Sequence, residues 1–193
     1  DTRNFDMPSW VFHAEYPMVR WLEANGYDLT YFTHVDGVRN ASLVLNHKTY
    51  MFTGHDEYWN GQLRLNVEAA RDAGVNLAFF NGNAVFWKTR WENSIDGSNT
   101  PYRTVVCYKE TANESKIDPL DPPTWTGTWR DANKANPEGA MPENALTGTI
   151  FTVNANRMDP LIIPAKYSKL RFWRNTEVAQ LKDGEQFVTG NGM

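Results

Sequence analysis

The chain has one cysteine, no long apolar run and no block of basic residues. The single Cys107 excludes an internal disulfide framework and any metal site made only of cysteines, and it leaves the redox compartment open. No apolar stretch approaches the ~18 to 20 residues that cross a bilayer, so a membrane is not an expected partner. The 19 Lys and Arg against 23 Asp and Glu give a net charge of -4, which also argues against a nucleic acid partner.

The length of 193 residues and the 41% hydrophobic content favour one compact α/β domain over residues 1–193. We expect a soluble protein, with the cytoplasm slightly favoured. The chain begins at Asp1 rather than Met, so we expect a piece of a longer protein. Aromatic residues are abundant, with 8 Trp, 8 Tyr and 10 Phe. This exceeds the usual need of a core of this size, so some of them are expected to line a surface.

The first third of the chain alternates between helical and extended patterns. Residues 14–25 repeat apolar side chains at helical spacing and end at Asn25-Gly26, which predicts a helix. Residues 27–32 alternate and predict a strand, which leads into a loop around Asp36-Gly37. A short helix or turn is predicted over residues 41–46.

The next segment predicts strand, helix, strand and helix in that order. Residues 49–53 and 75–80 have the length and composition of strands. Between them Leu63, Val67 and Ala70 have helical spacing. Trp87 and Trp91, one turn apart, predict a second helix. Alternation of this kind predicts an open, mostly parallel sheet with helices on both faces, as in flavodoxin-like proteins.

The second half of the chain changes in character. Residues 103–109 predict a strand, and residues 111–145 are rich in proline and contain Trp125 and Trp129. A loop of this length inside a compact domain is usually a binding element or a mobile cover, so we predict a lid. Short strands are predicted over residues 149–153, 161–163 and 169–173, as an antiparallel extension of the sheet.

Two polar segments follow neighbouring predicted strands. Residues 54–59, with the sequence GHDEYW, follow the first strand, and residues 81–83, with the sequence NGN, follow the second. Consecutive parallel strands end at the same edge of a sheet, where ligands bind in this class of fold. We therefore expect both sets of side chains to meet at one rim.

The first of these segments contains an imidazole and two carboxylates in consecutive residues. In an extended or turning backbone His55 and Glu57 can face one way while Asp56 faces the other. Such a group suits metal binding, general base catalysis or proton relay. The alternative is that Asp56 or Glu57 caps the helix that follows and His55 bonds a carbonyl. The position at a strand end, directly before Tyr58 and Trp59, favours function.

The second segment occupies a strand-to-helix turn of the kind that presents a nucleophile in several α/β enzymes. Here no Ser or Cys is present. The amides of Asn81 and Asn83 cannot attack a carbonyl, but they can donate a hydrogen bond to a developing oxyanion. The alternative is an ordinary turn in which Asn tolerates a positive φ.

Several other side chains are candidates for ligand contacts. Tyr58, Trp59, Asn81 and Trp87 are candidates for substrate binding, and Trp125 and Trp129 could form an aromatic wall. Cys107 is expected to be a buried small side chain. The remaining histidines, which are His13, His34 and His47, are expected to be structural.

Several segments together resemble the carboxy-terminal domain of the N,N-dimethylformamidase large (beta) subunit family. The resemblance covers nearly the whole chain. The matching segments are WLE at 21–23, GYD at 26–28, GHDEYW at 54–59, EAARDAGVNLAFF at 68–80, GN at 82–83, WKTRW at 87–91, ENALTG at 143–148 and LRFWRNT at 170–176.

This resemblance implies a fold similar to class I glutamine amidotransferases and an activity of amide hydrolysis. It further implies a mononuclear iron held by tyrosines and one glutamate. By match, Glu57 would bind the metal, His55 would orient substrate or water, and Asn83 would help to polarise the carbonyl. The tyrosine ligands would lie upstream of the GHDE motif, one of them near or before residues 3–5, and they are not identified in this chain.

The resemblance also implies a small subunit or a second copy of the chain as a partner. Two functions remain open from the sequence. The first is metal-assisted hydrolysis of a small amide, in which hydroxide attacks without a covalent intermediate. The second is a non-catalytic glutamine amidotransferase-like module that binds carbohydrate or a partner chain through the Trp-rich loop.

Overall fold

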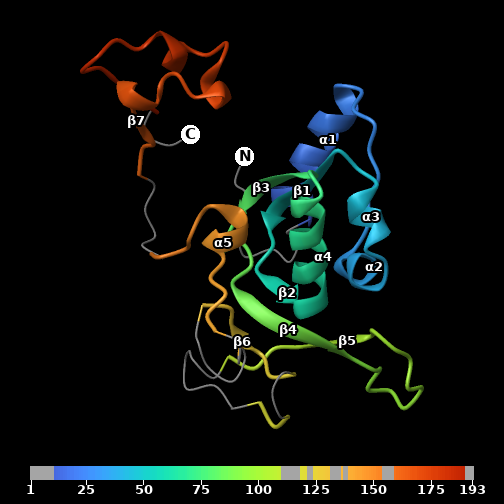
Figure 1. Ribbon diagram of the computed structural model, residues 1–193. Helices are drawn as coiled ribbons and strands as arrows, with labels where there is room; N and C mark the ends of the chain where they lie inside the picture. The colour runs from blue at the N-terminus through green and yellow to red at the C-terminus, as the bar shows by residue number, and fades with distance from the viewer. Residues whose placement is uncertain are drawn as a thin grey trace. The chain divides into compact units, whose positions relative to one another are not determined.

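A computed structural model describes residues 11–109, 118–120, 124–130, 136, 139–153 and 159–189 (Figure 1). The chain divides into two compact units, Asp1–Phe151 and Thr152–Met193, and each is described by itself. Among the described helices, none combines the length and the apolar character needed to span a bilayer.

The described part of the first unit begins with a π-helical turn, η1 (Val11–Glu15), that continues into α1 (Tyr16–Ala24). Pro17 lies in the first turn of α1, the part of a helix that tolerates proline. Asn25 closes the helix through its backbone N–H. The helix predicted over residues 14–25 is thus confirmed.

The prediction of a strand over residues 27–32 was wrong, because this segment is irregular. Its aromatic side chains are held by local contacts. The hydroxyl of Tyr31 donates to Glu23 Oε1 at 2.9 Å, and Phe32 stacks on Tyr50 with ring centroids 5.2 Å apart. An alternating pattern favours an extended backbone, but it does not supply a neighbouring strand for pairing.

The loop predicted around Asp36-Gly37 was also wrong, since a helix, α2 (His34–Arg39), occupies it. Thr33 and Asp36 form a reciprocal capping box: Thr33 Oγ1 accepts from the Asp36 N–H, and Asp36 Oδ2 accepts from the Thr33 N–H. The short helix predicted next is confirmed as α3 (Ser42–Leu45).

A parallel strand–helix–strand unit follows, as predicted. Strand β1 (Thr49–His55) pairs with β3 (Asn76–Gly82), with Thr49 opposite Asn76 and His55 opposite Gly82. Helix α4 (Gly61–Asp72) lies between them in the chain (Figure 1). Asn60 caps this helix by accepting from the Gln62 N–H at 2.8 Å.

A second sheet is built around β4 (Trp87–Glu92). Strand β2 (Tyr58–Asn60) pairs with it in parallel, and β5 (Thr104–Val106) and β6 (Gly127–Thr128) pair with it in antiparallel. The predicted strand over residues 103–109 is confirmed by β5. Among the described residues the sheets are therefore small and open, and only partly parallel, rather than one mostly parallel sheet.

The helix predicted through Trp87 and Trp91 was wrong, because these residues lie in β4. A spacing of four residues fits one helical turn, but it equally fits two pleats of a strand. The intervening Thr89 is 5% exposed and shares the inward face with Trp87, which is the two-residue period of a strand.

The core of this unit lies between α4 and the strands. Leu63, Val67 and Ala70 form one fully buried face of α4. They pack with Val44 of α3, Phe52 of β1, Trp59 of β2 and Val85 of the β3–β4 connection. Trp129 and Leu146 complete this core. Burial of such side chains contributes roughly 1.5–3 kcal/mol each and fixes β1 and β2 beside α4.

Much of the predicted lid, residues 111–145, lies outside the described residues. Trp125 and Trp129, which are described, are 9% and 2% exposed. Trp125 Nε1 donates to the Asp118 carbonyl at 2.8 Å, and Arg64 and Lys88 lie over the Trp129 ring. Both tryptophans are thus packed side chains rather than an open aromatic wall. Helix α5 (Asn144–Thr147) follows.

The described residues of the second unit contain one antiparallel pair, β7 (Ile162–Pro164) with β8 (Gln186–Val188). Three 3-10 turns join these strands: η2 (Ala165–Tyr167), η3 (Arg171–Trp173) and η4 (Glu177–Gln180). The strand predicted over residues 161–163 is confirmed by β7. Those predicted over 149–153 and 169–173 were wrong, since the first is irregular and the second contains η3.

Candidate functional site

The polar segment GHDEYW runs from the end of β1 to the start of β2, and Gly54 is the residue before the last of β1. Gly54 has a φ of +81°, a conformation that residues with a Cβ rarely adopt. A Cβ at this position would lie 2.6 Å from Glu15 Cγ and 3.3 Å from Ala14. The absence of a side chain therefore allows η1 to lie against β1 immediately before His55.

His55 and Glu57 are brought together, as the sequence predicts. His55 Nε2 and Glu57 Oε2 are 2.9 Å apart, and the side chains are 36% and 14% exposed. An ionised carboxylate can only accept, so Nε2 is the donor in this contact. The pair combines a carboxylate with an oriented imidazole.

Glu57 is fixed by β4 as well as by His55. Its second oxygen, Oε1, accepts from Trp87 Nε1 at 3.0 Å. Its backbone carbonyl accepts from the N–H groups of Phe86 and Trp87 at 3.0 and 2.9 Å. The segment after β3 therefore holds Glu57 through both its side chain and its backbone, so that its carboxylate has a defined orientation.

Asp56 faces another direction and contacts His34, which the sequence reading treated as structural. Asp56 Oδ1 lies 2.9 Å from His34 Nε2. The ring of His34 packs edge-on against Trp59, with centroids 5.8 Å apart. The Thr33–Asp36 spacing could have indicated the helix that positions His34, in place of the predicted loop, but the contact joins residues 22 positions apart and no local pattern indicates it.

Lys109 is a further member of the cluster that the sequence reading missed. Its Nζ donates to the Tyr58 hydroxyl at 2.6 Å and lies over the rings of Tyr58 and Trp87, at 4.8 and 5.0 Å from their centroids. Burial opposes its charge, but the Tyr58 hydroxyl and the carboxylate of Glu57 outweigh this effect and raise the pKa of Lys109. We call His55, Glu57, Tyr58, Trp87 and Lys109 the His55–Glu57 site.

The two asparagines lie at the end of the neighbouring strand. Asn81 is opposite Gly54 in the register, and Asn83 follows Gly82, the partner of His55. Asn83 has a φ of 52° and Val85 a φ of 55°, so the chain turns sharply here. Both amide atoms of Asn81 are buried without a hydrogen-bond partner within the described structure. An unsatisfied buried amide costs about 1–3 kcal/mol and indicates a group that a ligand could satisfy.

The other aromatic candidates differ in their surroundings. Trp59 has no exposed surface and belongs to the hydrophobic core. Tyr58 is 37% exposed. Trp87 is 5% exposed, and its indole N–H donates a hydrogen bond to Glu57. Tyr50, in β1, is half-buried, and burial together with the negative charge of Asp56 strongly raises the pKa of its phenol.

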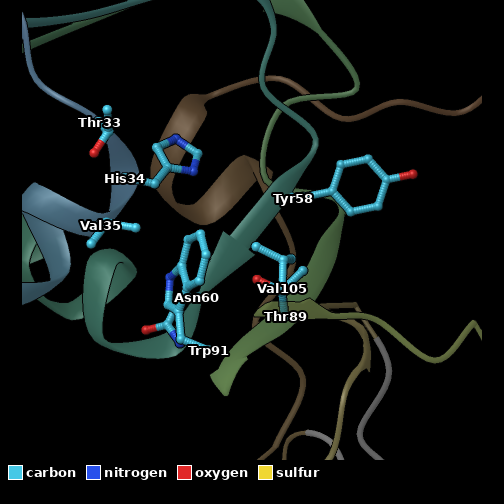
Figure 2. Close-up of a pocket in the computed structure, with 8 residues that line it drawn as sticks. All are labelled: Thr33, His34, Val35, Tyr58, Asn60, Thr89, Trp91 and Val105. Carbon is cyan, nitrogen blue, oxygen red and sulfur yellow. The ribbon is translucent and has the colours of Figure 1, made fainter. Parts of the chain in front are cut away.

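Two cavities adjoin the polar segment. The larger, of about 1110 Å³, is lined by His55, Asp56 and Glu57 together with residues of α1 and the segment that follows it. The smaller, of about 290 Å³, is shown in Figure 2. Thr33, His34 and Tyr58 line both cavities.

The donors suitable for a metal are few. The part of the chain that the structure describes contains no cluster of three or more His, Cys, Asp or Glu side chains that could hold a metal ion. A metal beside Glu57 would therefore need oxygen donors of another kind, such as tyrosine phenols. The expected position of one tyrosine ligand, near or before residues 3–5, lies outside the described residues.

Comparison with known proteins gives one family. The family model described as N,N-dimethylformamidase beta subunit-like, C-terminal, matches residues 1–193. No curated protein matches the chain significantly.

Proposed function

The chain belongs to the N,N-dimethylformamidase beta subunit-like C-terminal family, and from this premise we propose that it carries the catalytic groups for hydrolysis of a small amide C–N bond, without a covalent acyl-enzyme. The observation that carries the proposal is the His55–Glu57 pair, held at 2.9 Å at the edge of a parallel strand–helix–strand unit. We also propose that this unit is part of a class I glutamine amidotransferase-like fold.

Glu57 is the residue that would hold a metal. Each of its oxygens accepts one hydrogen bond, from His55 and from Trp87, and each carboxylate oxygen has a second lone-pair direction to offer. The resemblance suggests iron, with tyrosines as further ligands. A metal at this position supplies Lewis acidity toward the amide carbonyl and toward water.

The imidazole of His55 would handle the proton. Because Glu57 holds Nε2, the imidazole has a defined orientation from which it would orient water or accept its proton. The amide of Asn83 would donate to the carbonyl oxygen of the substrate, where negative charge develops. The side-chain amide of Asn81 supports this assignment. It has no hydrogen-bond partner within the described structure, and Asn81 lies on β3 directly opposite Gly54 of β1.

The alternative of a non-catalytic module that binds carbohydrate through tryptophans has less support. Trp125 and Trp129 are buried, so they present little surface to a sugar. The polar groups of the His55–Glu57 site would also have no role in such a module.

The test is the hydrolysis of N,N-dimethylformamide. The measured quantity is the dimethylamine that the reaction releases. Glu57→Gln keeps the shape of the side chain but removes its charge, and His55→Asn removes the basic nitrogen. Both should lower kcat at least a hundredfold, which is the range for loss of a general base. Glu92→Gln, a change at a half-exposed glutamate of β4, is the control that should retain activity. Full activity in Glu57→Gln would overturn the proposal.

If the wild-type protein does not hydrolyse dimethylformamide, the same variants can be compared on formamide and acetamide. The proposal concerns the reaction and its residues, so a change of substrate does not affect the expected order of the variants. Absence of hydrolysis of all three amides by the metal-loaded wild-type protein would overturn it.

A further inference from the structure

The smaller cavity is a built pocket that the proposed reaction does not use. Four elements contribute to it: the start of α2, β2, β4 and β5. In Figure 2 the indole of Trp91 extends toward the imidazole of His34. Thr89, on the floor of this pocket, is 5% exposed. Residues from positions 33 to 105 thus converge on one space of about 290 Å³.

The lining has a distinct chemistry. It contains no Lys, Arg, Asp or Glu. Its two titratable rings each face a charge from outside the lining: His34 Nε2 faces Asp56, and the Tyr58 hydroxyl accepts from Lys109 Nζ at 2.6 Å. A carboxylate entering this pocket would meet no cation of its own, and an ammonium would meet no unpaired carboxylate. Burial of an unpaired charge is strongly unfavourable, so the lining selects against charged molecules.

The polar groups can bind a neutral ligand. Asn60 uses its Oδ1 to cap α4, which leaves its NH2 group as the donor it can offer. The hydroxyl of Thr89 and the ring of His34 add further hydrogen-bonding groups. Trp91, Val35 and Val105 provide the apolar surface. Ligand pockets typically combine such a mainly apolar wall with a few polar groups.

We propose that this pocket, bounded by His34, Asn60, Thr89, Trp91, Val35 and Val105 and sharing only Tyr58 with the His55–Glu57 site, is a second small-molecule site for an uncharged aromatic molecule with one amide or hydroxyl group. Its size supports this class of ligand. An engineered cavity of about 150 Å³ binds benzene, so a pocket nearly twice as large accommodates a ring with a polar substituent. The Asp56–His34 contact fixes the orientation of the His34 ring, which is one of the polar groups of the pocket.

The experiment is a titration of the protein, labelled in its valine methyl groups, with benzamide, benzoate and benzylammonium. These probes have nearly the same shape and differ in charge. Val35 and Val105 line the smaller pocket, whereas Val19 and Val44 line the larger cavity, so the methyl signals report which cavity is occupied. The Glu57→Gln variant is used, because it prevents turnover at the other site.

Benzamide should shift the Val35 and Val105 signals in a saturable manner, at least tenfold more tightly than either charged probe. Val105→Phe should abolish this binding by filling the pocket. Val188→Phe, at a similarly exposed valine of β8, should leave it intact. If Val105→Phe disturbs the fold, His34→Gln provides a second test and should weaken binding at least threefold.

Shifts confined to Val19 and Val44, equal binding of all three probes, or no saturable shift would overturn the proposal. None of these results bears on amide hydrolysis, since no readout involves turnover. Failure of this second site is therefore distinguishable from failure of the proposed function.

Discussion

Asp56 and Glu57 are adjacent in the chain, yet their carboxylates pair with different histidines. Oδ1 of Asp56 lies 2.9 Å from His34, and Oε2 of Glu57 lies 2.9 Å from His55. Alternation of side chains along an extended backbone produces this division. As a result, each of the two adjacent carboxylates has an imidazole partner of its own.

The Trp87–Glu57 hydrogen bond leads to a first prediction. Trp87→Phe keeps the aromatic packing but removes the N–H that donates to Glu57 Oε1 at 3.0 Å. Groups that orient a metal ligand typically contribute 10–100-fold to affinity or activity. We therefore expect kcat for amide hydrolysis to fall roughly 10–100-fold, with an unchanged circular dichroism spectrum.

Trp173→Phe is the matched control, because Trp173 lies in η3 of the second unit. It should retain wild-type kcat. If Trp87→Phe were as active as this control, the orientation of Glu57 by β4 would have no role in the reaction.

The close approach of η1 to Gly54 leads to a second prediction. Gly54→Ala combines backbone strain at a φ of +81° with a contact of 2.6 Å to Glu15 Cγ. Gly74→Ala has similar strain at a φ of +99°, but no atom lies within 4 Å of its Cβ. Strain alone costs about 1–3 kcal/mol, and the crowding at Gly54 adds to it.

The free energy of unfolding, measured in urea, should therefore decrease more in Gly54→Ala than in Gly74→Ala. The first variant should also lose hydrolytic activity, because His55 follows directly. Equal destabilisation by both variants would mean that η1 does not pack on β1 as described.

Acid stability provides a third prediction. Burial alone would raise the pKa of Glu143, but the hydrogen bond from Arg130, that residue's positive charge and the Phe151 N–H outweigh it and hold the pKa of Glu143 below its usual value. Asp118, paired with Arg90, has a lowered pKa for the same kind of reason. A carboxyl group whose pKa is lower in the folded state than in the unfolded state stabilises the folded protein at every pH above the unfolded-state pKa. This stabilisation is lost as the pH falls through the folded-state pKa.

The melting temperature should therefore decrease as the pH is lowered from about 5 toward 2, below the ordinary carboxyl pKa near 4. Glu143→Gln should have a lower melting temperature at neutral pH and a smaller decrease in acid. Differential scanning calorimetry across this range measures both. A decrease in acid as large as that of the wild-type protein would show that Glu143 does not contribute to it.

The fold could be predicted where local patterns and tertiary packing agree. The β1–α4–β3 unit has buried strands, a helix with one apolar face and glycine at its end, and all of these features were readable. The strand at β4 could not be distinguished from a helix, because Trp87 and Trp91 fit both periods. The pairing that decides between them comes from β2, β5 and β6, which are remote in sequence.

The candidate site shows the same division. The contact between His55 and Glu57 follows from alternation over three residues and was predicted. The contacts of Asp56 with His34 and of Tyr58 with Lys109 join residues 22 and 51 positions apart. Only the three-dimensional packing of α2, and of the segment that follows β5, against β2 brings them together.

The most direct test of the account is the metal content of the protein purified after growth with iron, measured by elemental analysis alongside Glu57→Ala and the control Glu92→Ala. We predict close to one iron per chain in the wild-type and control proteins and nearly none in Glu57→Ala. Equal iron in all three proteins would remove Glu57 from the ligand set and contradict a metal-assisted reaction at the His55–Glu57 site.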